Sequence, residues 1–362
     1  MRSCQVAWIV FFATTLVLSL PAQAVNKSVD NPKGYAWEYH LQGFSQKDYQ
    51  AAVEALIVDF ERTEGKSLNP GKTGRVGLKV DTFSGGVFAT PLALTRAVIA
   101  ILEERGFAPE NIFILDQSTE LLRKAGYLPP LSAASEPLFD GVHPVYALDT
   151  EGFYGTEWFY ESPLPSVNRW FPLAFDWKQT LKSINEERKS FLPMPLMFGV
   201  DFWINLPVVR DDTTLGVRGA LANASLGAVS NVRRFADKVT NAPIAVAEIA
   251  AIPELRKPWI FTLMSLEKYQ FVGGPIYNAL YTKVEPRIWL SSNPVVLDYV
   301  MFRKINRARV NSRFPTIEPT PVVFDYCEVL GLGDYGNVRW ARSSMHFPMI
   351  GNQSTNTLVK RD

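Results

Sequence analysis

The stretch VGLKV at residues 76–80 leads, through a polar loop and an amphipathic run, to NIFIL at residues 111–115. Both end segments are short and apolar, which is typical of buried strands. Between them, residues 91–105 place apolar side chains on one helical face, and Gly106 follows as the C-cap. A strand, a helix and a strand in this order predict a parallel βαβ crossover, and therefore an α/β fold.

Polar side chains stand at the ends of both predicted strands. Lys79 and Asp81 close the first strand, and Asp116 closes the second. Ligands of parallel sheets bind beyond the carboxyl ends of the strands, so these residues are candidates for a site at one edge of the sheet. Thr90 is expected to cap the helix, whose first turn would then attract an anion. In the alternative interpretation, Asp81 and Thr90 are ordinary turn and cap residues and Lys79 is solvated.

A second polar region follows another apolar run. Residues 198–206 are predicted to form a strand that Pro207 ends, which puts Asn205 at its carboxyl end. The Gly- and Ala-rich residues 214–229 predict a helix that approaches the sheet closely. Asn223 on that helix must find hydrogen-bond partners if it is buried, so it is either a structural cross-link or a ligand contact.

The C-terminal half supplies further elements of the same kind. Residues 259–266 and 287–290 predict two more strands, and Asn293-Pro294 begins a helix that carries Asp298 one turn in. We expect Asp298 at the same edge as the other candidates, although the helix dipole alone favours an acidic residue there. The predicted fold is α/β, with a mostly parallel or mixed sheet and helices on both faces.

Composition divides the rest of the chain. Residues 129–177 are dense in proline and aromatic side chains, which indicates an insertion or lid; packing of an irregular subdomain explains it better than a ligand-stacking surface. The predicted organisation is a signal peptide at 1–24, an N-terminal leader and helix at 25–74, an α/β domain at 75–335 that contains the insertion, and a C-terminal tail at 336–362.

The first residues have the pattern of an export signal. Arg2 precedes an apolar run over residues 6–20, and Ala22-Gln23-Ala24 has the small-x-small form of a signal-peptidase site. We therefore expect Sec-type export to the periplasm or the extracellular space, with no stable membrane span once the signal is cleaved. The alternative is an N-terminal membrane anchor that is not cleaved.

Composition also excludes several classes of function. The formal net charge is +1, which gives no general attraction to nucleic acid. Of the two cysteines, Cys4 lies in the predicted signal and Cys327 then stands alone, so neither a disulfide nor a cysteine-ligated iron–sulfur cluster is expected. The hydrophobic share of 47% is enough for a large folded core. Nothing in the composition fixes the oligomeric state.

Three segments in order resemble a known family. INLPVVRDDTTLGVRGALANASLG at residues 204–227 resembles the central block of the uncharacterised bacterial and archaeal family called domain of unknown function 362. LKVDTFSGGVFATP at residues 78–91 looks like the family's opening block, and GGP at 273–275 with SSNPVVLDYV at 291–300 looks like its closing block. The resemblance covers roughly residues 75–335 and implies an α/β fold without the ferredoxin-like extension of some relatives.

The family itself has no settled activity, so the resemblance implies an approximate site and no reaction. Arg210 and Asp212 stand where the family tends to have lysine and histidine, Asp81 replaces its asparagine, and Asn293 replaces its aspartate. Any site in this chain therefore uses a different set of side chains from that of the family.

The residues support two hypotheses. In the first, the protein binds a small anionic molecule or an oxygen-ligated divalent metal at the carboxyl ends of the strands, with or without catalysis. Carboxylates at Asp81, Asp116 and Asp298 would suit Mg, Ca or Mn. The second is a noncatalytic exported binding or interaction protein. The candidate ligand-binding residues are Lys79, Asp81, Thr90, Asp116, Asn205, Arg210, Asp212, Asn223 and Asp298.

Overall fold

The computed structural model describes residues 34–132, 136–161, 188–336, 338–343 and 357–359. The predicted signal peptide at 1–24 and residues 162–177 of the predicted insertion lie outside the described residues.

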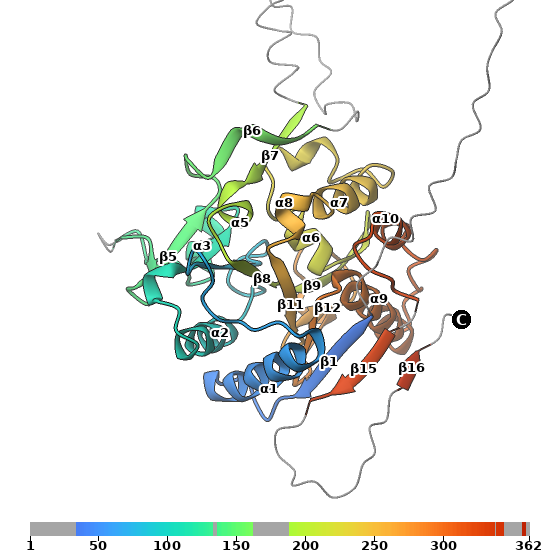
Figure 1. Cartoon of the computed structure of the whole chain (residues 1–362). Coiled ribbons are helices and arrows are strands. Elements are labelled where there is room, and N and C mark those ends of the chain that lie inside the picture. The colour runs from blue at the N-terminus through green and yellow to red at the C-terminus, as the bar shows by residue number, and fades with distance from the viewer. Residues whose placement is uncertain (1–33, 133–135, 162–187, 337, 344–356, 360–362) are drawn as a thin grey trace, which may run out of the picture.

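A ten-stranded sheet forms the centre of the molecule (Figure 1). Its order is β16-β15-β1-β14-β11-β8-β2-β3-β5-β4, and the run from β11 to β5 is parallel throughout. The strands β14, β4 and β16 run against their neighbours, so the sheet as a whole is mixed. The strands are β1 (Tyr35–His40), β2 (Val76–Val80), β3 (Ile112–Asp116), β4 (Leu138–Phe139), β5 (His143–Ala147), β8 (Phe202–Leu206), β11 (Trp259–Ser265), β14 (Arg287–Ser291), β15 (Val338–Arg342) and β16 (Thr357–Val359).

Helices cover both faces of this sheet, as predicted. Along β8, Phe202 and Ile204 pack into one hydrophobic core and Trp203 packs into the other, because successive side chains of a strand point to opposite faces. One core contains α1 (Gln46–Glu64) and α2 (Leu92–Glu104), with α3 (Thr119–Lys124) at its margin. The other contains α5 (Met194–Met197), α6 (Ala220–Ala224), α7 (Ala242–Ala250), α8 (Pro253–Arg256), α9 (Pro294–Asn311) and α10 (Val323–Val329).

Two small sheets extend this framework. A four-stranded sheet in the order β10-β9-β12-β13 is built from β9 (Val209–Asp212), β10 (Gly216–Arg218), β12 (Tyr269–Gln270) and β13 (Thr282–Lys283). A two-stranded sheet pairs β6 (Tyr154–Glu161) with β7 (Lys189–Pro193). The four-stranded sheet follows directly on β8 and β11, so it stands beyond the carboxyl ends of the parallel strands.

The sequence predicted the central βαβ unit correctly, and β2 has the predicted bounds. The predicted helix at 214–229 is wrong: the chain forms the short strand β10 and then only the five residues of α6. Each of the nearby glycines fills a tight position, and Gly216 has a φ of 72°, which a helix cannot include.

Three segments that composition set apart belong to the main sheet. The expected leader contains β1, which lies between β15 and β14. The expected C-terminal tail contains β15, and the expected insertion contains β4 and β5, of which β5 pairs in parallel with β3. These strands are less completely buried than β2, β3 and β8, because they lie toward the margins of the sheet, where fewer residues are buried on both faces.

The position of β1 leads to a test on Trp37. Trp37 is 3% exposed and packs its ring edge-on against Phe60 of α1. We expect Trp37→Ala to lower the free energy of unfolding by about 3–5 kcal/mol, as for other buried aromatic truncations. Denaturant unfolding measures this, with His40→Ala at the exposed end of the same strand as the control. A change below about 0.5 kcal/mol would mean that the segment is a loosely docked leader.

Candidate functional site

A fully buried lysine lies at the centre of the predicted site. Lys79 of β2 is aligned with Asn205 of β8, and its side chain is 0% exposed. Its Nζ donates to Asp116 Oδ1 at 2.7 Å, to Asn223 Oδ1 at 2.8 Å and to the Val80 carbonyl at 2.8 Å. An ammonium has three hydrogens, so every donor is satisfied. The interpretation of Lys79 as a solvated residue is therefore wrong.

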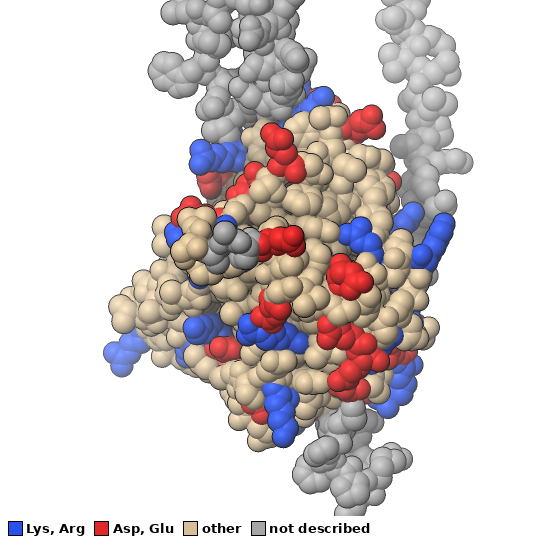
Figure 2. Space-filling view, turned by 90° about the vertical axis from the view of Figure 1, so that its left-hand side faces the viewer, with Lys and Arg blue, Asp and Glu red and all other residues tan. Residues whose placement is uncertain are grey.

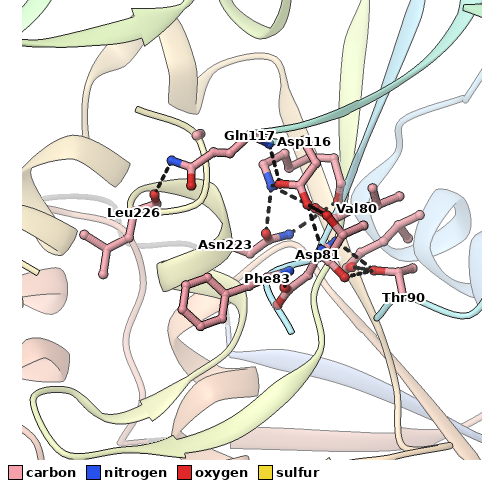
Figure 3. Close-up of polar contacts among 12 residues, drawn as sticks. Val80, Asp81, Phe83, Thr90, Asp116, Gln117, Asn223 and Leu226 are labelled. Atoms are coloured by element: carbon pink, nitrogen blue, oxygen red, sulfur yellow. Dashed lines mark hydrogen bonds and ion pairs between the residues drawn. The ribbon is translucent and has the colours of Figure 1, made fainter. Parts of the chain in front are cut away.

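Asp116, the partner of Lys79, is equally saturated. Its Oδ1 also accepts the Gln117 amide at 2.8 Å, and its Oδ2 accepts both the amide and the hydroxyl of Thr82, at 2.7 and 2.6 Å. Figure 3 shows the side chain of Asp116 above that of Asn223. A carboxylate with this many donors is held in one orientation. Within the fold, Asp116 neutralises the charge of Lys79 and fixes the start of the loop after β2.

The two asparagines connect the sheet to α6. Asn223 donates through Nδ2 to Asn205 Oδ1 at 2.8 Å, and Asn205 donates to the Ala220 carbonyl at 2.9 Å. Asn205 is 0% and Asn223 is 5% exposed. Of the two roles left open for Asn223, the structure shows the structural cross-link. Close approach of α6 to the sheet, which the Gly- and Ala-rich sequence predicted, is what brings these amides together.

Asp298 reaches the same region by a route that the sequence did not predict. We expected Asp298 at the carboxyl edge of the parallel strands, but β14 is antiparallel to β11 and ends at the opposite edge. From there α9 carries Asp298 back under α6. Its carboxylate accepts the amides of Ala220 at 2.6 Å and Leu221 at 2.9 Å. The helix end that Asp298 stabilises is therefore that of α6, whereas its own helix has no acidic residue in the first turn.

The surroundings of Asp298 are apolar and tight. Burial raises the pKa of Asp298 to about 7, and the two amide donors lower it only in part. A Cβ at Gly219 would lie 2.3 Å from its Oδ1, so a larger residue at that position would displace the carboxylate. Asp298 is 1% exposed and lies in the interior, away from solvent at the edge of the sheet.

Asp81 and Arg210 form a second buried ion pair. Arg210 Nη2 lies 2.6 Å from Asp81 Oδ2, and its Nη1 donates to Ser84 at 2.7 Å. Burial would raise the pKa of Asp81, but the Arg210 guanidinium outweighs it and holds that pKa below its usual value. Arg210 lies 5.1 Å from the ring centre of Phe83 and 5.5 Å from that of Phe88, which supplies cation–π contacts in place of water.

The expected role of Thr90 as a helix cap is wrong. The N-cap of α2 is Pro91, which offers no side-chain acceptor. The Thr90 hydroxyl instead accepts the Asp81 amide at 2.8 Å and donates to the Leu206 carbonyl at 2.5 Å. Thr90 thus ties β2 to β8, and the amide groups of the first turn of α2 receive no side-chain cap.

Asp212 stands apart from the other candidates. It lies on β9, accepts the amides of Thr214 and Leu215 at 2.8 Å each, and pairs with Arg218 Nε at 3.0 Å. These contacts shape the turn between β9 and β10. The structure therefore joins Lys79, Asp116, Asn205, Asn223 and Asp298 in one interior network, places Asp81, Arg210 and Thr90 beside it, and leaves Asp212 outside.

A small pocket opens near the carboxyl edge of the sheet. It encloses about 130 Å³ and lies between the loop from β2 to α2, the start of α2, and the loop from β11 to β12. Thr90 is the one predicted residue that lines it; the charged lining residues are Glu267 and Lys268. Lys268 Nζ donates to the Val87 carbonyl at 3.1 Å, and Glu267 Oε2 accepts from the Tyr49 hydroxyl at 2.8 Å.

Sequence reasoning missed Glu267 and Lys268, although a signal was present. Both follow directly on β11, a parallel strand whose carboxyl end points to the same edge as those of β2 and β8. The strand was predicted from residues 259–266, and the same rule that selected Lys79 and Asp116 applies to the residues after it.

Three further properties of the described residues bear on function: the surface charge, groups of metal-binding side chains, and the length of apolar helices. On the face in Figure 2, basic and acidic side chains are interspersed among neutral ones. Within the described ranges, no group of three or more His, Cys, Asp or Glu side chains is placed to hold a metal, and Mg, Ca or Mn binding stays a prediction. The helices of the described part of the chain include none long and apolar enough to cross a membrane.

Comparisons with known proteins add no function. No family model and no curated protein sequence matches the chain. A crystal structure of a Thermotoga maritima protein, determined in a structural genomics programme, is 12% identical and has a TM-score of 0.33. The alignment covers 75% of this chain, which spans 59% of the length of that protein. A likeness at this level supports no conclusion about either the fold or the activity.

The buried ion pair of Lys79 and Asp116 can be tested by a double-mutant cycle. Lys79→Met leaves the buried Asp116 carboxylate without its cation and Asn223 Oδ1 without its donor, so we expect the free energy of unfolding to fall by about 3–5 kcal/mol. Lys79→Met combined with Asp116→Asn should lose less than the sum of the two single changes, because the second change removes the unpaired charge. Denaturant unfolding gives all four values. Exposed Lys72→Met is the control; an equally small effect at Lys79 would refute the buried pair.

The raised pKa of Asp298 predicts how stability depends on pH. Between the usual pKa of 3.8 and about 7, the folded state keeps a proton that the unfolded state loses. Stability from this group is therefore fully present at low pH and falls as the pH rises toward 7, by up to about 1.4 kcal/mol per pH unit. We expect Asp298→Asn to remove this part of the slope between pH 4.5 and 7. Unfolding curves at several pH values measure it, and exposed Asp237→Asn serves as the comparison. An unchanged slope would count against the raised pKa.

Proposed function

We propose that this protein binds a small anionic molecule in the pocket between α2 and the loop that follows β11. The observation that carries the proposal is the start of α2. This helix of 13 residues begins at an N-cap proline without a side-chain cap, and Pro91 and the first helical residue, Leu92, line the pocket. Uncapped amides and the positive end of the helix dipole favour a bound anion.

Lys268 adds a full positive charge to the same pocket. Its Nζ is held by the Val87 carbonyl, which leaves two ammonium hydrogens for a ligand. The Val87 loop leads directly into α2, whereas Lys268 follows β11 much later in the chain. An anion there would be bound by the backbone amides of α2 and by the ammonium of Lys268. Such charge-assisted hydrogen bonds are stronger than neutral ones.

We assign binding and no catalytic residue to the site. Lys79, Asp116 and Asn223 are saturated by one another and buried, which favours the noncatalytic hypothesis over a reaction at these groups. Export to the periplasm or beyond rests on the pattern of residues 1–24, and membership of the domain of unknown function 362 rests on the three sequence blocks. Both remain part of the proposal.

The proposal is tested with inorganic phosphate and propionate as probes. We expect either anion to raise the melting temperature of the full chain in proportion to its occupancy. Lys268→Met should weaken the binding roughly tenfold, as the loss of one charged hydrogen bond does. Pro91→Asp should abolish it, because the new carboxylate caps α2 itself, while stability is kept by a cap worth about 1 kcal/mol.

Exposed Lys66→Met is the matched control for the loss of one positive charge, and it should leave the binding unchanged. Calorimetric titration supplies the dissociation constants. If neither anion binds the native protein, or if Pro91→Asp binds as well as the native protein, the pocket is not an anion site.

A further inference from the structure

The same pocket also has a negatively charged wall. Glu267 lines it together with Lys268, and the two residues adjoin in the chain. Glu267 is held in place because its Oε2 accepts the Tyr49 hydroxyl at 2.8 Å and its amide donates to Ser265 at 3.1 Å. Within the described residues, Oε1 has no hydrogen-bond partner that the structure shows. A simple anion would meet repulsion from this carboxylate.

Tyr49 and Ser265 also bond to each other at 2.7 Å, which orders the whole group. A tyrosine has one hydroxyl hydrogen, so when Tyr49 donates to Glu267 the Ser265 hydroxyl donates to Tyr49. Glu267 therefore receives a neutral donor and no cation from Tyr49 and Ser265. A ligand that brings a cation to Oε1 would complete the site.

We propose that the ligand of this pocket is a small zwitterion, namely an α-amino acid with a short aliphatic side chain. This inference rests on the proposed anion site. The ligand carboxylate binds the first amides of α2 and Lys268, and its ammonium binds Glu267. Opposite charges on one small molecule match the opposite charges that line one small pocket.

The size and the walls of the pocket restrict the side chain. A volume of about 130 Å³ equals the space of about four water molecules, which suits a molecule of about five or six non-hydrogen atoms. Apart from Thr90 and Ser265, the remaining lining is apolar and includes the short side chains of Val87, Ala89, Ala125 and Val208. Glycine and alanine have this size, and a methyl group is compatible with those walls.

The test compares alanine, propionate and ethylamine by calorimetric titration of the full chain at pH 7. Alanine carries both charges, propionate carries only the carboxylate, and ethylamine carries only the ammonium. We expect alanine to bind at least tenfold more tightly than propionate. Glu267→Gln should weaken the binding of alanine by about tenfold or more. The same change should leave the binding of propionate equally tight or make it tighter, because the repulsive charge is gone. Exposed Glu151→Gln is the matched control and should change neither affinity.

The outcomes separate this inference from the anion site itself. The zwitterion proposal is refuted, and the anion site stands, if propionate and phosphate bind but alanine binds no more tightly. The same conclusion follows if Glu267→Gln weakens the binding of alanine, propionate and ethylamine alike. If no probe binds while the protein is folded by its unfolding curve, both fail. Tight binding of ethylamine without alanine would also overturn the inference.

Discussion

The burial of one ammonium group constrains more of this structure than any other single interaction. A lysine charge moved into a protein interior is very costly unless its hydrogens all find acceptors. Lys79 finds a carboxylate from β3, an amide oxygen from α6 and a carbonyl of its own strand. Each acceptor belongs to a different element, so the sheet and α6 must hold their relative positions for the charge to be tolerated.

The same requirement extends outward along a chain of hydrogen bonds. Asn223 contacts Lys79 and Asn205, Asn205 contacts Ala220, and Ala220 contacts Asp298 on α9. A helix of only five residues such as α6 has little stability of its own. Asp298 binds its first amides, and the sheet binds the side chain of its Asn223. The tight glycine at 219 is a consequence, because the carboxylate occupies the space of a Cβ.

The sequence predicted the parts of this arrangement that depend on local pattern. Short apolar runs located β2, β3, β8 and β11, and the rule for parallel strands selected Lys79, Asp116 and Asn205. The direction of β14 was not predictable, because an apolar run has the same pattern in either direction and only its pairing decides. Burial of Lys79 was missed for a related reason: the residues that neutralise it come from positions 116 and 223, and sequence spacing does not show that they meet.

The relation between the interior network and the pocket explains why the predicted residues and the open site differ. The network holds the loop from β2 to α2 at both ends: Asp116 binds Thr82 at its start, and Thr90 binds Asp81 and Leu206 at its finish. That loop forms one wall of the pocket. A binding site gains affinity when its walls are already ordered, since less freedom is lost on binding. The buried charges therefore order a wall of the pocket without contacting its interior. The groups that can contact a ligand are the backbone of α2 and the residues that follow β11.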